Sequence, residues 1–179
     1  DGQTQLGTAN RDYDIFITKY DSHGTKQWSK QFGSSVSESF HSAAISTTDE
    51  IYITGYTTGN FDGGGLAGMN DSFILRVDSN GNQLGIVQDG DSCCGNGSTG
   101  KSRNGHVIAV DSSGNYYQAG LTGGAIDGLS HSQASLPGYS TSTTNTHKYD
   151  LFVRKYNSSH VLQWTKLFDS LQNSSTESR

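Results

Sequence analysis

The stretch DIFITKYDSHGTKQW, residues 14–28, decides the fold, because the chain repeats it twice more without gaps. The second copy is DSFILRVDSNGNQLG, residues 71–85, and the third is DLFVRKYNSSHVLQW, residues 150–164. Each copy begins with β-branched and aromatic residues, which are typical of strands. A tight turn follows, for which the Asp and Gly of the first two copies are well suited. We therefore predict a β-hairpin for each copy.

A second pattern, HSAAISTTDEIYITGYT at residues 41–57, aligns with HVIAVDSSGNYYQAGLT at residues 106–122. It predicts another hairpin, so that the repeating unit is two hairpins, or four antiparallel strands. Internal repeats made of four short strands are typical of propeller blades. The sequence thus predicts an all-β protein, a β-propeller built from four-stranded antiparallel blades.

The pattern D-x-F-I-x-K-Y-D-S-x-G-x-x-x-W of residues 14–28, followed by IYITGYT at residues 51–57, resembles the bacterial seven-bladed β-propeller (SBBP) repeat family. The resemblance covers residues 12–168. It departs from the pattern at Gly85, which stands where the first and third copies have Trp, and at His160, which replaces the turn glycine. The resemblance implies a propeller on an extracellular or cell-surface protein and brings no catalytic residues with it.

The repeats divide the chain into four segments. Residues 1–13 form a linker or the end of a preceding blade, 14–70 the first blade repeat, 71–149 the second, and 150–179 the first half of a third. A propeller needs about four blades to close. We therefore expect an incomplete segment of a larger propeller. Either missing blades of the same polypeptide or further copies of the chain would complete the ring.

Two loop insertions, at residues 89–105 and 129–148, distinguish the second repeat. In an antiparallel blade the short hairpin turns share one end, and the connections between hairpins share the other. The insertions therefore belong to the end opposite the short turns. Because binding usually resides in loops on a rigid scaffold, we expect this end to bind a glycan or a protein. Neutral drift in tolerant loops is the alternative. The residues expected on this interaction face are Cys93, Cys94, His106, His131 and Tyr139.

Cys93 and Cys94 are adjacent, and they are the only two cysteines of the chain. In an oxidising compartment they can form a strained vicinal disulfide, which would be a rigid platform for a ligand or a staple for the loop. Free thiols and bridges to another chain are the alternatives.

Asp89 and Asp91 alternate in the way that calcium ligands do, but Ca²⁺ requires six to eight oxygen ligands. Capping of turns and strand ends explains these aspartates with fewer ligands, so we expect no cofactor, and a calcium site is the alternative hypothesis. Residues 95–102, GNGSTGKS, match the phosphate-loop pattern letter for letter. That loop works at the start of a helix, and a strand is expected here instead.

Composition narrows the function further. The net charge of −5 argues against a nucleic-acid partner. No apolar run approaches the roughly 20 residues that span a bilayer, and no nucleophile–base set or carboxylate pair is evident. We therefore expect a non-enzymatic module at the cell surface or outside the cell, acting as a binding or structural scaffold. The alternatives are a self-assembling filament or coat component, and part of a secreted hydrolase or lyase whose catalytic residues lie on missing blades.

Overall fold

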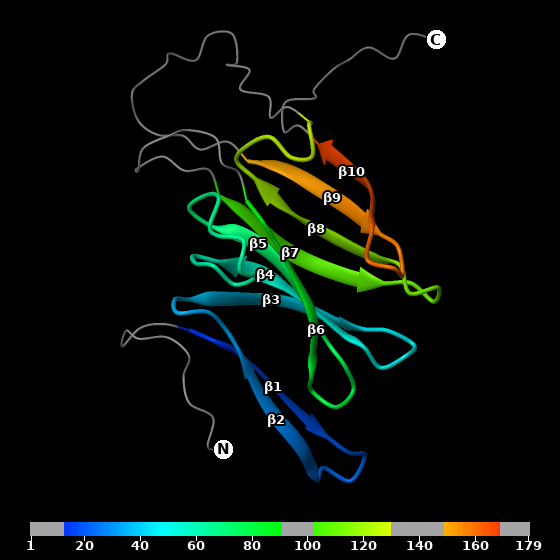
Figure 1. Cartoon of the computed structure of the whole chain (residues 1–179). Helices are drawn as coiled ribbons and strands as arrows, with labels where there is room; N and C mark the ends of the chain where they lie inside the picture. The colour runs from blue at the N-terminus through cyan, green and yellow to red at the C-terminus, as the bar shows by residue number, and fades with distance from the viewer. Residues whose placement is uncertain (1–12, 91–101, 130–148, 169–179) are drawn as a thin grey trace, which may run out of the picture.

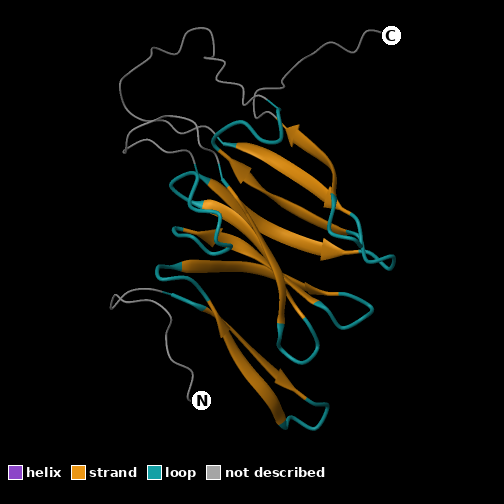
Figure 2. Cartoon of the chain, viewed as in Figure 1, coloured by secondary structure: helices purple, strands orange, loops and turns teal. Residues whose placement is uncertain are grey.

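A computed structural model describes residues 13–90, 102–129 and 149–168, and strands are the only regular elements among them (Figures 1 and 2). The strands are β1 (Ile15–Tyr20), β2 (Lys26–Phe32), β3 (Glu38–Ile45), β4 (Ile51–Thr57), β5 (Asp71–Val77), β6 (Gln83–Asp89), β7 (Arg103–Val110), β8 (Tyr116–Thr122), β9 (Asp150–Tyr156) and β10 (Leu162–Phe168). The prediction of an all-β protein with four-stranded antiparallel sheets is confirmed.

The strands form three separate sheets in chain order. Strands β1 and β2 make a two-stranded sheet, β3–β6 make a four-stranded sheet, and β7–β10 make another. Strand β7 contacts β3, β4 and β5, so the two larger sheets pack face to face. The hairpin β1–β2 lies on the other face of β3–β6, where Ile15 and Phe32 join a core cluster with Phe73. The sheets are therefore stacked one on the next.

The sheets and the sequence repeats are out of phase by one hairpin. Residues 14–70, expected to be one blade, supply β1–β2 to one sheet and β3–β4 to the next. The same division applies to residues 71–149, whose strands β5–β6 and β7–β8 belong to different sheets, and residues 150–179 supply β9–β10 to the last sheet. The strand register explains this division, because Gly55 on β4 lies opposite Phe73 on β5 and Gly120 on β8 lies opposite Phe152 on β9.

The turns within hairpins and the connections between hairpins lie at opposite ends of the strands (Figure 1). Turns within hairpins are closed by a side-chain oxygen that accepts two backbone N–H groups, at Asp21, Asp78, Asp111 and Asn157. Ser46 does the same through its hydroxyl. We call the opposite end, to which the links β2–β3, β4–β5, β6–β7 and β8–β9 belong, the long-connection end.

Candidate functional site

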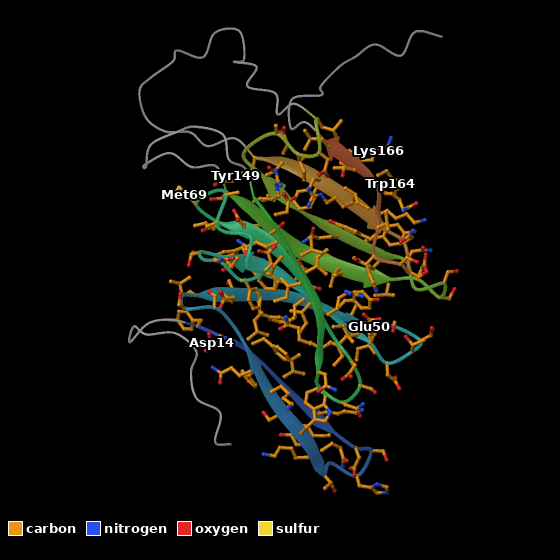
Figure 3. The ribbon with its side chains drawn as sticks, in the orientation of Figure 1. Asp14, Glu50, Met69, Tyr149, Trp164 and Lys166 are labelled. Carbon is orange, nitrogen blue, oxygen red and sulfur yellow. The ribbon has the colours of Figure 1, made fainter. Side chains whose placement is uncertain are left out.

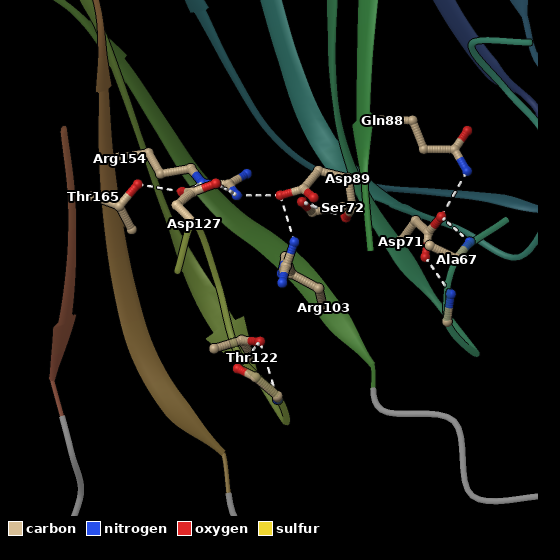
Figure 4. A network of polar contacts seen from close by, with 12 residues as sticks. Ala67, Asp71, Ser72, Gln88, Asp89, Arg103, Thr122, Asp127, Arg154 and Thr165 are labelled. Atoms are coloured by element: carbon tan, nitrogen blue, oxygen red, sulfur yellow. Dashed lines mark hydrogen bonds and ion pairs between the residues drawn. The ribbon is translucent and has the colours of Figure 1, made fainter. Parts of the chain in front are cut away.

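A network of charged side chains joins the two four-stranded sheets near the long-connection end (Figure 4). Asp89, the last residue of β6, forms ion pairs with Arg103 at the start of β7 and with Arg154 on β9. Arg154 also binds Asp127 in a bidentate manner, with its Nε and Nη2 at 2.8 and 2.9 Å from the two carboxylate oxygens. Thr165 on β10 donates its hydroxyl to Asp127. Both arginine side chains are only 3% exposed.

Burial works against charge in this network, but the ion pairs outweigh it. Burial alone would lower the pKa of Arg154, yet the carboxylates of Asp89 and Asp127 raise that pKa above its ordinary value. Burial alone would raise the pKa of Asp127, yet the Thr165 hydrogen bond and the charge of Arg154 lower it. Arg154 and Asp127 are therefore both charged at neutral pH, and their mutual contacts compensate for the loss of water.

The alignment of the repeats shows what this network replaces. Asp89 occupies the position of Phe32, and Arg154 occupies the position of Leu75. Phe32 and Leu75 belong to the apolar cluster between β1–β2 and the sheet β3–β6. At the next junction the same two positions hold opposite charges. A hydrophobic contact has thus been exchanged for an ion pair at an equivalent place in the stack.

Gln118 is a further polar residue of this junction that replaces an apolar residue of the preceding one. It occupies the position of Ile53, which is buried in the first cluster, and is itself 1% exposed. Its side-chain amide donates to the Thr54 hydroxyl at 2.8 Å and to the Phe73 carbonyl at 3.3 Å, both on the neighbouring sheet. The junction is thus specified by hydrogen bonds as well as by shape.

A tyrosine stack completes this junction toward the short turns. Tyr116 on β8 lies 4.8 Å from Tyr52 and 4.8 Å from Tyr156, measured between ring centroids. Ile74 and Ile108 belong to the same cluster. Burial raises the pKa of Tyr52 to about 12, so this phenol stays neutral at physiological pH. The tyrosines are thus the apolar part of the junction, and beside them Arg76 pairs with Glu50 at 3.1 Å and contacts His160 of the other sheet.

Asp71 holds the link between β4 and β5 in place. Its carboxylate accepts the backbone N–H groups of Ala67 and Gly68 at 2.8 and 2.9 Å, and the amide of Gln88 at 2.9 Å (Figure 4). In the first repeat Gln31 makes the same contact with Asp14. Asp71 therefore caps its strand, and Asp14 is bound by the equivalent glutamine.

A pair of histidines joins the first strands of the two larger sheets. His41 on β3 stacks on His106 on β7, with ring centroids 4.7 Å apart and an interplanar angle of 21°. The Nδ1 of His41 lies 2.9 Å from the Gly105 carbonyl, to which it donates, and Tyr56 packs edge-on at 5.5 Å. Burial, and then the charge of His41, lower the pKa of His106. The two histidines occupy equivalent positions in the first and second repeats.

Of the residues predicted from the sequence, two lie in the described regions. His106 is exposed and stacked on its counterpart, and Asp89 is bound by two arginines. Cys93, Cys94, Asp91, His131 and Tyr139 lie outside the described residues. The vicinal disulfide and the calcium site remain predictions, although Asp89 is already paired with guanidinium groups. Among residues 13–90, 102–129 and 149–168, no three His, Cys, Asp or Glu residues are grouped to hold a metal.

Sequence reasoning missed Arg103, Gln118, Asp127 and Arg154 as a connected set. The signal was present, because aligning the repeats shows Arg154 and Gln118 at positions where another copy has an aliphatic residue. Arg103 similarly stands at the position of Glu38, a buried residue that accepts a hydrogen bond from Thr57 in its own repeat. Reading the differences between copies, rather than their identities, would have located the junction.

Comparison with known proteins adds no relative: no protein-family model matches the chain, and no curated protein matches it. Within the described residues no helix is long and apolar enough to cross a membrane.

Proposed function

We propose that the chain is a segment of an extracellular or cell-surface β-propeller of the SBBP repeat type, acting as a non-enzymatic binding scaffold. The observation that carries this proposal is the stacking of consecutive four-stranded sheets, with the longer connections between hairpins at one end. A propeller is built by the same kind of sheet-on-sheet succession.

The two ends of the strands differ in a way that suits such a scaffold. The short turns repeat one hydrogen-bonded geometry, with an Asx side chain closing four of them. The long-connection end differs from repeat to repeat, and the links β6–β7 and β8–β9 belong to it. Rigid, uniform turns at one end and variable loops at the other are the usual arrangement of a scaffold that binds through its loops.

The charged network supports a scaffold rather than a catalyst. Asp89, Asp127 and both arginines are bound to one another, and the arginines are buried. A catalytic acid or base must instead reach a substrate proton. The network holds one sheet against the next close to the long-connection end, and so fixes the positions of the strand ends from which the loops begin.

An array of immobilised polysaccharides, probed with the 179-residue chain, tests this proposal. We expect binding that is lost when residues 91–101 are replaced by an equally long Gly/Ser segment. The matched control carries lysines at Ser22 and Ser112 in two short turns, and should bind like the wild type. Binding that survives the loop replacement but fails in the turn variant would place the interaction at the wrong end. Release of new reducing ends from a bound polysaccharide would contradict the non-enzymatic assignment.

A protein ligand would be found by the same pair of variants. If the array shows no binding, the chain can be immobilised and exposed to intact cells and secreted proteins of the source. Retention by the wild type and the turn variant, but not by the loop variant, supports a protein ligand. Equal retention by all three chains would count against the long-connection end as the interaction surface.

A further inference from the structure

Within the part of the chain that the structure describes, two apolar faces at the ends of the stack have no sheet packed on them. The tail face is the side of β7–β10 that points away from β3–β6, and its exposed members are Val107, Leu151, Trp164 and Phe168, which are 54, 45, 40 and 51% exposed. Phe168 lies directly opposite Leu151 in the strand register, so both side chains project from the same face. Trp164 projects from β10 (Figure 3).

The head face is the side of β1–β2 that points away from β3–β6. Its members are Phe16 and Tyr20, which are 75 and 58% exposed, and the adjoining turn with Gly24. Ile15, the neighbour of Phe16, points the other way and belongs to the cluster shared with β3–β6. The head and tail faces thus lie at opposite ends of the same stack.

Leu151, Phe168 and Trp164 of the tail face have counterparts that contact the next sheet inside the chain. Leu151 and Phe168 correspond to Ile15 and Phe32, which are 4 and 8% exposed because the sheet β3–β6 packs on them. Trp164 corresponds to Trp28, whose indole N–H donates to the Ser79 carbonyl of the next sheet at 3.1 Å. Lys155 corresponds to Lys19, whose ammonium donates to the same carbonyl at 2.9 Å.

The head face has covered counterparts as well. Phe16 and Tyr20 correspond to Phe73 and Val77, which are both 0% exposed in the cluster between β1–β2 and β3–β6. Gly24 corresponds to Gly81, where an added Cβ would lie 3.2 Å from the Trp28 ring, whereas Gly24 has no atom within 4 Å of that point. The turn at Gly24 therefore leaves the space that a tryptophan occupies at Gly81.

We propose that a second copy of this chain docks head to tail, with its head face on the tail face of the first copy. The contact repeats the junction between β1–β2 and β3–β6. Phe168 and Leu151 cover Phe16 and Tyr20 of the next copy, while Trp164 lies against Gly24 and donates to the carbonyl of Ser22, the counterpart of Ser79. Complementarity comes from the repeat itself, because Phe16 and Tyr20 stand at the positions of Phe73 and Val77, which pack with Ile15 and Phe32 within the chain.

This contact is heterologous, since the two surfaces that meet are different. Such contacts form rings if the rotation closes and open filaments if it does not. The docking concerns the two ends of the stack and does not depend on what the long-connection end binds. Its failure and the failure of the proposed function are therefore separate results.

Sedimentation velocity of the 179-residue chain, over a range of concentrations, tests the docking. The wild type should form species larger than the 19.2 kDa monomer. Phe16→Asp removes the head face and Trp164→Ser removes the tail face, and each should weaken association about tenfold or more. Gly85 stands at the position of Trp164 in the second repeat, so the fold accepts a small residue there. Met69→Asp, at an apolar side chain that is 53% exposed and lies outside both faces, is the matched control.

Mixing the two variants gives the sharpest result. Phe16→Asp retains an intact tail face, and Trp164→Ser retains an intact head face. One chain of each can therefore dock once, so the mixture should form a dimer of twice 19.2 kDa and nothing larger. A wild type that remains monomeric up to about 1 mM overturns the proposal and leaves a further repeat of the same polypeptide as the occupant. Association that persists in both single variants overturns it too, because it would use other surfaces.

Discussion

Asp89 on β6 forms an ion pair with Arg154 on β9, across the junction between the two four-stranded sheets. The preceding junction has Phe32 and Leu75 at these positions. The two junctions therefore place their contacts at equivalent positions, but the contact is apolar at the first junction and charged at the second. Such a change makes one junction distinct from the next, since a charged sheet face pairs poorly with an apolar one.

Removing the carboxylate charge should destabilise the chain strongly. Asp89→Asn leaves Arg103 and Arg154 with less compensation at 3% exposure, and we expect a loss of about 3 kcal/mol in the free energy of unfolding. Urea denaturation followed by circular dichroism measures it. A loss below about 1 kcal/mol would be typical of a surface ion pair and would contradict the buried network.

A double-mutant cycle isolates the pair itself. Arg154→Gln combined with Asp89→Asn should cost less than the two single changes added together, with a coupling of about 1–3 kcal/mol. Additive losses would show that the two side chains do not stabilise each other.

The close approach of backbones at Gly55 predicts a severe effect of one methyl group. An added Cβ would lie 1.8 Å from the Ser39 carbonyl on β3, so Gly55→Ala should cost about 3 kcal/mol or more. Gly64→Ala is the matched control, because its Cβ would approach only the Asp62 side chain, at 3.1 Å. Equal stability of the two variants would contradict the close approach of the β3 and β4 backbones at Gly55.

Turn closure by Asp78 predicts a difference between two substitutions. Asp78→Asn keeps an acceptor for the N–H groups of Asn80 and Asn82, as Asn157 does in the third repeat, whereas Asp78→Ala removes it. The alanine variant should therefore have the lower urea midpoint. Hydrogen bonds from Asn82 lower the pKa of Asp78, so its contribution is complete above the ordinary value of 3.8 and is lost as the pH falls below it. An alanine variant as stable as the asparagine variant at pH 7 would contradict this role.

The stacked histidines predict destabilisation at mildly acidic pH. Burial and the neighbouring His41 lower the pKa of His106 from 6.5, so the unfolded chain binds the proton more readily. Stability is then complete above pH 6.5 and falls as the pH drops through the range below it. His106→Gln should reduce the loss measured between about pH 7.5 and 5.5. Part of the loss should remain, because burial and Arg76 also lower the pKa of His160. An unchanged pH dependence in His106→Gln would contradict the lowered pKa of His106.

Local structure could be predicted well from the sequence. The three copies of the first hairpin carry their strand and turn signals within about 15 residues, so that Asp21 and Gly24 alone indicate the turn between β1 and β2. Capping by the aspartates was also foreseen as an alternative, and Asp71 shows it directly. These features depend on contacts between near neighbours in the chain.

The phase of the sheets could not be predicted in this way. In a repeat of two hairpins, the first hairpin can form a sheet either with the second hairpin of its own repeat or with that of the preceding repeat. The pairing of β4 with β5 depends on the fit between Gly55 and Phe73. The charged junction also escaped prediction, because Asp89 and Arg154 are 65 residues apart and meet only when two sheets stack. Asp89 therefore suggested a metal ligand, whereas in the structure its partners are arginines.

Amide hydrogen exchange of the native chain, measured residue by residue, tests the central claim that each sheet is shared by two consecutive repeats. Strands β4, β5, β8 and β9 have a partner on both sides, whereas β1 has β2 as its one partner among the strands that the structure describes. We therefore expect slow exchange throughout β5 and β9, and fast exchange at alternate amides of β1, their counterpart in the first repeat. Equal protection of β1 and β5, with a fast-exchanging edge between β4 and β5, would contradict the account.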